Sequence, residues 1–137
     1  MRHRMRGRRL GRSTSHRRAM ARNLISSLFI HGRVETTEPK AKEYKAMAEK
    51  LITLSKEKNL HRVRRAVQLI GSKQAVAVLF DKIGPSMVDR PGGYTRILKL
   101  GKPRLGDNGA RVLWELVTYE AQPAAVAEDA EDAVVGS

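Results

Sequence analysis

The first regular hydrophobic pattern in the chain predicts a helix from about residue 13 to residue 30. Apolar side chains recur there every three or four positions, the spacing that places them on one side of a helix. They are Met20, Ala21, Leu24, Ile25, Leu28 and Phe29. Ser13, Thr14 and Ser15 are candidate N-caps, and Gly32 is a candidate stop. We therefore expect one buried side, with Arg22, Asn23 and Ser26 on the other.

A short strand and three more helices are expected over the middle of the chain. Residues 33–37 favour extended structure, and Thr37-Glu38-Pro39 then supplies a hydroxyl cap, an acid and a proline, which suit the first turn of a helix. The predicted buried seam of that helix is Ala41, Tyr44, Ala48, Leu51 and Ser55. The third helix would bury Leu60, Val63, Val67 and Ile70 and end at Gly71. The fourth, capped by Ser72 and ended by Gly84-Pro85, would bury Val76, Leu79, Phe80 and Ile83.

Two strands, over residues 94–100 and 111–119, are expected to complete the fold. Residues 101–109 join them with three glycines and two cations, so this connection is expected to project as a basic finger. The predicted fold class is α+β: a single two-layer domain over residues 13–120, with helices packed on a small mixed sheet. Residues 1–12 are predicted to be an extended arginine-rich arm. Residues 121–137 are predicted to be a disordered, acidic, alanine-rich tail.

The charge of the chain is large and unevenly distributed. The formal net charge is +13, and the ten arginines among the first 34 residues are accompanied by no acidic residue. Such a segment repels itself, so alone it is expected to be extended and mobile, and to become ordered only against a polyanion. Arginine forks match phosphate oxygens two at a time, which favours nucleic acid as the partner.

The candidate RNA-binding residues lie in the arm, on the first two helices and around the basic finger. They are Arg2, His3, Arg4, Arg6, Arg8, Arg9, Arg12, His16, Arg17, Arg18, Arg22, Lys40, Lys42, Tyr94, Arg96, Lys99, Lys102 and Arg104. Tyr94 is included because an aromatic ring among cations can stack on a base. The alternative for Tyr94 is that it covers the edge of the sheet. Arg62, Arg64 and Arg65 of the third helix are as consistent with a solvated helix face as with RNA contact.

No enzyme site is predicted. The chain has no cysteine, and its four histidines lack the spacing of a helical zinc site, so neither a metal nor a cofactor is expected. The neighbouring Ser15 and His16 point apart on a helix and have no carboxylate to orient the imidazole. No glycine-rich phosphate loop is present, and the longest apolar run, Ala75 to Phe80, is too short to cross a membrane. A small-molecule substrate is not expected.

Two functions of other classes compete with a structural RNA-binding role. A nucleoid-type DNA-binding protein would also be small, basic and free of cysteine, but no DNA-docking motif is evident. An RNA-modifying enzyme would require a nucleophile, a cofactor loop or a metal set. A third alternative is that the start of the chain, which is rich in arginine and poor in acidic residues, is a removable mitochondrial transit peptide.

Several separated motifs resemble the bacterial seventeenth large-subunit ribosomal protein family, over residues 1 to about 119. They are Met1-Arg2-His3-Arg4, Ser15-His16-Arg17, Ala19-Met20, Arg22-Asn23, Thr36-Thr37, Pro39-Lys40-Ala41-Lys42-Glu43, Leu51-Ile52-Thr53-Leu54, Leu79-Phe80, Gly84-Pro85, Gly92-Gly93-Tyr94-Thr95-Arg96-Ile97-Leu98-Lys99, Gly106-Asp107-Asn108 and Glu115-Leu116-Val117. Gly109-Ala110-Arg111-Val112 departs from the usual family stretch, and the acidic tail lies outside the shared part.

The resemblance implies a non-enzymatic, cytoplasmic component of the large ribosomal subunit. Its implied partners are large-subunit ribosomal RNA and neighbouring large-subunit ribosomal proteins. It also implies an α+β fold with a small sheet backed by helices. Because the family motif begins at residue 1, no removable presequence is expected.

Overall fold

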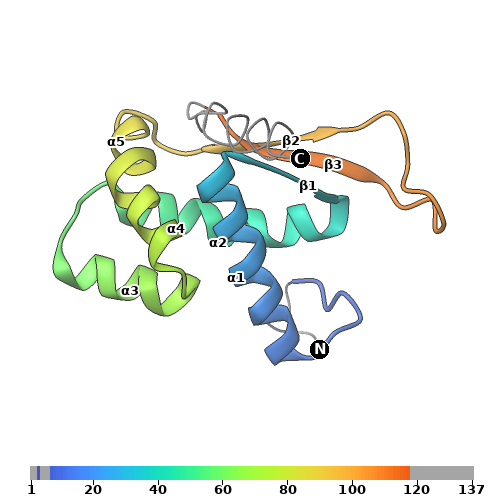
Figure 1. Cartoon of the computed structure of the whole chain (residues 1–137), viewed down its shortest axis with the longest axis horizontal. Coiled ribbons are helices and arrows are strands. Elements are labelled where there is room, and N and C mark those ends of the chain that lie inside the picture. Colours follow the sequence, from blue (N-terminus) through green and yellow to red (C-terminus); the bar gives the residue numbers. More distant parts are fainter. Residues whose placement is uncertain (1–2, 4–6, 118–137) are drawn as a thin grey trace, which may run out of the picture.

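The computed structural model describes residue 3 and residues 7–117 and forms two layers, with the helices on one face of a small sheet (Figure 1). In chain order the elements are α1 (Thr14–His31), β1 (Arg33–Thr37), α2 (Glu38–Ser55), α3 (Leu60–Ile70), α4 (Lys73–Val78), η1 (Leu79–Ile83), α5 (Gly84–Ser86), β2 (Thr95–Lys99) and β3 (Arg111–Leu116). The predicted α+β class and order of elements are confirmed. The predicted acidic tail at 121–137 lies outside the described residues.

Helix α1 begins and ends where the sequence predicts, and α2 begins at the predicted place, although the Thr37 hydroxyl makes no capping hydrogen bond. The hydroxyl of Ser13 accepts a hydrogen bond from the His16 amide at 3.3 Å, so it caps the first turn of α1. Gly32 adopts a left-handed φ of 79° and donates its amide to the Leu28 carbonyl at 2.8 Å, which closes the helix. All five residues of the predicted α2 seam are buried.

The third helix corrects one prediction. Leu60, placed in the buried stripe by its spacing, is 63% exposed, whereas Ala66 and Ile70 are buried. The expected end at Gly71 is confirmed, with a left-handed φ of 80°.

The fourth helix does not end at Gly84-Pro85. After α4 the chain widens into one π-helical turn, η1, and continues as the short α5, whose start holds Pro85. Proline lacks an amide hydrogen, and the first turn of a helical segment tolerates its absence. Gly84 has a different role from a stop: a Cβ there would overlap the carbonyl oxygen of Ser55 and lie 2.9 Å from its hydroxyl. The buried positions predicted for this helix, Val76, Leu79, Phe80 and Ile83, are confirmed.

The sheet is antiparallel throughout, in the order β1-β3-β2, so the prediction of a mixed sheet is wrong. The strand β3 is central and alternates in burial: Val112, Trp114 and Leu116 face the helices. The opposite face carries the residues between them. No described helix covers that face (Figure 1).

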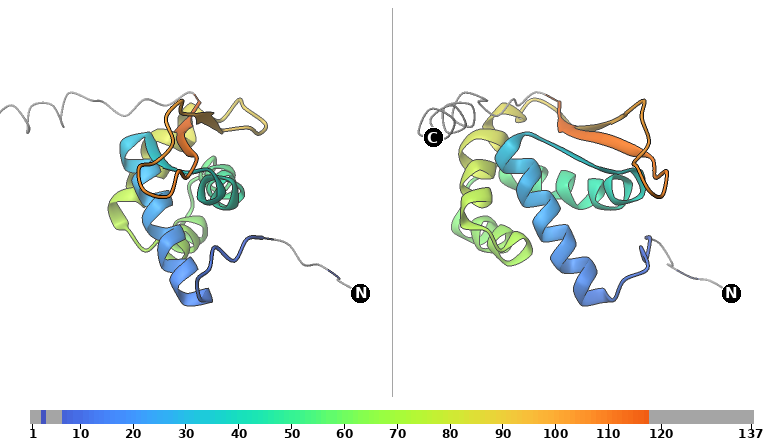
Figure 2. Two further views of the ribbon diagram at one scale, coloured as in Figure 1. Left: turned by 90° about the vertical axis from the view of Figure 1, so that its right-hand side faces the viewer. Right: turned by 45° about the vertical axis from the view of Figure 1, so that its right-hand side comes forward.

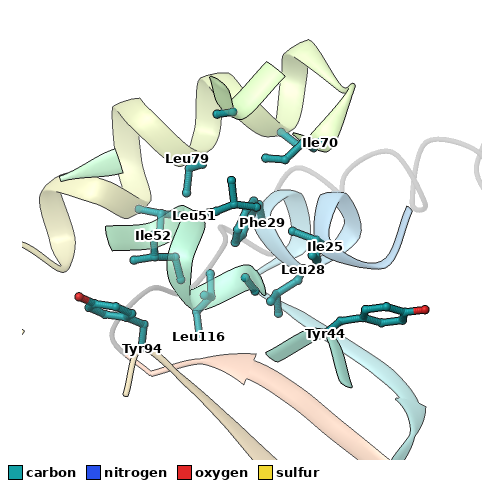
Figure 3. Close-up of a cluster of buried hydrophobic side chains, with 14 of the residues drawn as sticks. Ile25, Leu28, Phe29, Tyr44, Leu51, Ile52, Ile70, Leu79, Tyr94 and Leu116 are labelled. Carbon is teal, nitrogen blue, oxygen red and sulfur yellow. The ribbon is translucent and has the colours of Figure 1, made fainter. Parts of the chain in front are cut away.

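The core lies between the sheet and the helices. Phe29, Leu51 and Leu79 come from three different helices and meet in its centre (Figure 3). Trp114 and Leu116 close it from the sheet. Because this core uses every helix from α1 to η1, the positions of the surface cations are fixed by one packed body.

Candidate nucleic-acid interface

Part of the predicted arm lies against α2. The backbone amide of Arg8 donates to Glu43 Oε2 at 2.8 Å, and the guanidinium Nη1 of Arg8 lies 3.8 Å from the same oxygen. Leu10, partly buried, packs against the core, and Arg12 donates its amide to the Arg9 carbonyl at 3.1 Å. Residues 7–12 therefore contact the folded body through Arg8 and Leu10. The candidates Arg2, Arg4 and Arg6 lie outside the described residues.

A groove runs along the polar side of α1. It has a volume of about 830 Å³, and its far wall is the junction between α3 and α4. Arg18 and Arg22 lie along it with Asn23 and Ser26, and no acidic residue lines it. The guanidinium of Arg22 donates to the Gln68 carbonyl at 3.2 Å, which holds this side chain across the groove. The groove offers hydrogen-bond donors and positive charge along a helix, the chemistry that phosphate and ribose oxygens accept.

A second cleft, of about 570 Å³, brings together three segments that are distant in the sequence. The segments are the arm, the start of α2 and the end of the β2–β3 connection, and they lie on the same side of the molecule (Figure 2). Five of the predicted cations line this cleft: Arg8, Arg12, Lys40, Lys42 and Arg104.

The β2–β3 connection projects from the sheet, as predicted (Figure 1). Leu105 at its tip is 98% exposed. Arg104 is tied within the loop to Asp107, whose carboxylate also accepts from the Gly109 amide at 3.0 Å. These bonds lower the pKa of Asp107 far below its usual range, so the loop carries a fixed ion pair at neutral pH. Lys102 and Lys99 are exposed beside it.

The remaining predicted cations are exposed or half-exposed and lie on separate faces. His3, Arg9 and His16 are exposed, and Arg17 is half-exposed, with its guanidinium donating to Thr14 Oγ1 at 3.1 Å. Arg96 lies on the outer face of the sheet and pairs with Glu115. Because that pair neutralises it, Arg96 contributes less to the surface potential than its charge alone predicts.

Tyr94 corrects the sequence-based interpretation. Its side chain is 2% exposed and belongs to the core, and its hydroxyl contacts Thr53 Oγ1 at 3.2 Å. Lys56 lies over the ring, with Nζ 4.8 Å from the centroid. Both the face and the hydroxyl are thus used within the protein, so the ring is not available to stack on a base.

The acid at the start of α2 is held by two lysines. Glu38 Oε1 lies 2.6 Å from Lys42 Nζ and 4.0 Å from Lys99 Nζ. The hydrogen bond from Lys42 is the main cause of a lowered pKa of Glu38. The carboxylate is therefore charged and occupied at neutral pH.

Several residues of these clefts were missed by the sequence analysis. Glu43, Gly109 and Ala110 contact or line the cleft at the arm, and Ser27 and Gly71 line the groove along α1. No local pattern marks Glu43, because its partner Arg8 lies 35 positions earlier.

The described residues contain no cluster of three or more histidine, aspartate or glutamate side chains placed to hold a metal ion. Within the same part of the chain, no helix combines the length and apolar character needed to cross a membrane.

Comparison with known proteins identifies a close set of relatives. The family model described as ribosomal protein L17 matches residues 20–117. The large ribosomal subunit protein bL17 of Syntrophotalea carbinolica is 50% identical over 123 residues, which cover 90% of this chain and 79% of that protein. The bL17 proteins of Trichlorobacter lovleyi and Nitratidesulfovibrio vulgaris are 54% and 48% identical, over 90% and 96% of this chain and 98% of each relative.

Proposed function

Because the chain belongs to the ribosomal protein L17 family, it is a structural constituent of the large ribosomal subunit and not an enzyme, and we propose that its arm and clefts bind the folded RNA of that subunit. The observation that supports this proposal most strongly is the accumulation of cations in two clefts, one of them free of acidic residues. Family membership gives no support to the nucleoid alternative.

The binding that we propose depends on the RNA backbone more than on base sequence. The described surface offers arginine forks and hydroxyl and amide groups, while its best candidate for base stacking, Tyr94, is buried. Such a surface matches phosphates and ribose hydroxyls, which carry the shape of a folded RNA. We also propose that Arg2, Arg4 and Arg6 extend this contact, and that neighbouring large-subunit proteins cover faces that RNA leaves free.

Sedimentation tests the proposed function directly. A cell lysate is washed at high salt and separated on a density gradient, with and without ribonuclease, and the chain is detected with an antibody. We expect stoichiometric co-sedimentation with large subunits that is lost after ribonuclease treatment. Recovery with chromosomal DNA, or in the soluble fraction, would contradict the proposal.

A further inference from the structure

We propose that the cleft between the arm, the start of α2 and the β2–β3 connection is a binding site for a backbone phosphate of RNA, and that Glu43 is the positioning residue that holds the arm at its edge. This inference rests on the proposed RNA-binding function. It assigns one ligand chemistry to one site and a structural role to an acidic residue in a basic protein.

The charges that line the cleft favour an anion. Five cationic side chains and a single carboxylate, Glu38, line it. That carboxylate is already held by Lys42 and lies near Lys99. Neither Arg12 nor Lys40 forms an ion pair with any described residue. At least two cations are therefore available to a ligand without breaking an existing pair.

The arm is held largely by its main chain: the Arg8 guanidinium makes no hydrogen bond with any described residue, and Arg12 Nη1 donates only within the arm, to the Leu10 carbonyl at 2.7 Å. The contact at 2.8 Å joins the backbone amide of Arg8 to Glu43, whereas the guanidinium is 3.8 Å away and half exposed. Gly7, with a φ of 97°, brings the chain close: a Cβ there would lie 3.0 Å from Glu43 Oε1. Arg8 can therefore turn its guanidinium to a phosphate while the amide remains bound to Glu43.

Fixing the arm before binding reduces the entropic cost of binding. A free segment of this length would lose conformational entropy at each residue that a ligand orders. With residues 7–12 already docked through Glu43 and Leu10, Arg8 and Arg12 line the same cleft as Lys40 and Arg104 in the unbound protein. The cleft is thus assembled before RNA arrives.

The substitution Lys40→Gln tests the phosphate site. Binding of the full chain to folded large-subunit RNA is measured over a range of salt concentrations. We expect the slope of log affinity against log salt to decrease by about 0.7–0.9, which is the loss of one phosphate contact. Lys82→Gln, an exposed lysine of η1 outside the cleft, removes the same charge and is expected to leave the slope unchanged. Equal slopes for Lys40→Gln and the wild type would overturn the site.

The lack of native cysteine allows a second, direct measurement. An iron chelate that generates hydroxyl radicals is attached at Ala110→Cys, in the cleft, or at Lys82→Cys as a control. We expect the cleft probe to cut one short RNA segment that the control does not cut. No cut from Ala110→Cys in a complex that still forms would contradict the proposal.

The role of Glu43 is tested by whether the substitution Glu43→Gln raises or lowers the affinity for RNA. Removing an acid from a basic protein should strengthen RNA binding by charge alone. If Glu43 holds the arm, Glu43→Gln instead weakens binding and lowers the slope of log affinity against log salt by about 0.7–0.9, the loss of one phosphate contact. Glu57→Gln, an exposed matched control, should leave affinity equal or higher, and circular dichroism should show both variants folded. Tighter binding by Glu43→Gln would overturn the positioning role.

These outcomes separate the two proposals. A wild-type chain that fails to bind folded large-subunit RNA would contradict the proposed function itself. If the wild-type chain binds this RNA but Lys40→Gln leaves the salt slope unchanged, only the proposal of a phosphate site in the cleft is contradicted.

Discussion

At Gly84, the first residue of α5, the chain packs closely against Ser55 of α2. A Cβ at this position would overlap the carbonyl oxygen of Ser55, a backbone atom that cannot rotate away. We therefore expect Gly84→Ala to destabilise the protein by about 1–3 kcal/mol, the usual effect of overpacking. Urea unfolding followed by the fluorescence of the single, buried Trp114 measures this. Gly92→Ala, where nothing lies within 4 Å, is the control, and equal stability of the two variants would contradict the prediction.

Glu38 links stability to pH. The lysine contacts lower its pKa from the ordinary value of 4.5, so in the folded protein it releases its proton more readily than in the unfolded chain. Its contribution to stability is therefore present above pH 4.5 and is lost as the pH falls through the lower, folded pKa. We expect Glu38→Gln to reduce the acid sensitivity of the melting temperature below pH 4.5. An identical pH profile for the variant and the wild type would exclude this contribution.

In α3, the spacing of the apolar residues alone does not predict which of them are buried; their angular position around the helix axis also matters. At about 100° per residue, Leu60 lies about 80° around the helix from Ile70, at the edge of the buried side. We expect Ile70→Ala to cost about 2–5 kcal/mol, because Ile70 is buried in the core, whereas Leu60→Ala should change stability by less than about 0.5 kcal/mol. Chemical unfolding of both variants tests this, and a large effect at Leu60 would contradict the observed packing.

The elements that the sequence predicts well are those set by nearby residues. Ser13, Gly32 and Gly71 specify helix ends through bonds to residues three or four positions away, and the structure confirms each. The direction of β1 relative to β3 depends instead on a pairing across about 80 positions, for example Val34 with Trp114, which no local pattern specifies.

In the candidate interface, too, some features can be predicted from single residues and others depend on contacts between distant segments. The cations are evident from composition, since each carries its charge wherever the fold places it. Their grouping is not, because the cleft joins Arg8, Lys40 and Arg104 from three distant segments. Tyr94 could not be assigned correctly either: its burial depends on Thr53 and Lys56, which lie about 40 positions earlier.

The whole molecule combines a packed body with an arm whose residues 7–12 contact it, and two deletions of different length in the arm are expected to have different effects. Removing residues 2–6 takes away three arginines without touching the contacts of Arg8 and Leu10, so stability should not change. Removing residues 2–12 should cost about 1–2 kcal/mol through loss of the apolar contact of Leu10 but leave the domain folded, because its buried core begins at Ala21.

The salt dependence of RNA binding should decrease with the shorter deletion and decrease further with the longer one. If each lost arginine contacts a phosphate, the slope of log affinity against log salt falls by about 2–3 for residues 2–6 and by about twice that for residues 2–12. The double variant Lys50→Gln, Lys82→Gln removes two exposed lysines, from α2 and η1, that line neither cleft and serves as a charge control, with an expected change near zero. If the slope falls by the same amount per positive charge removed in this control as in the arm deletions, net charge governs binding. If the slope falls stepwise in the two arm deletions but not in the control, the position of the arm's arginines governs binding.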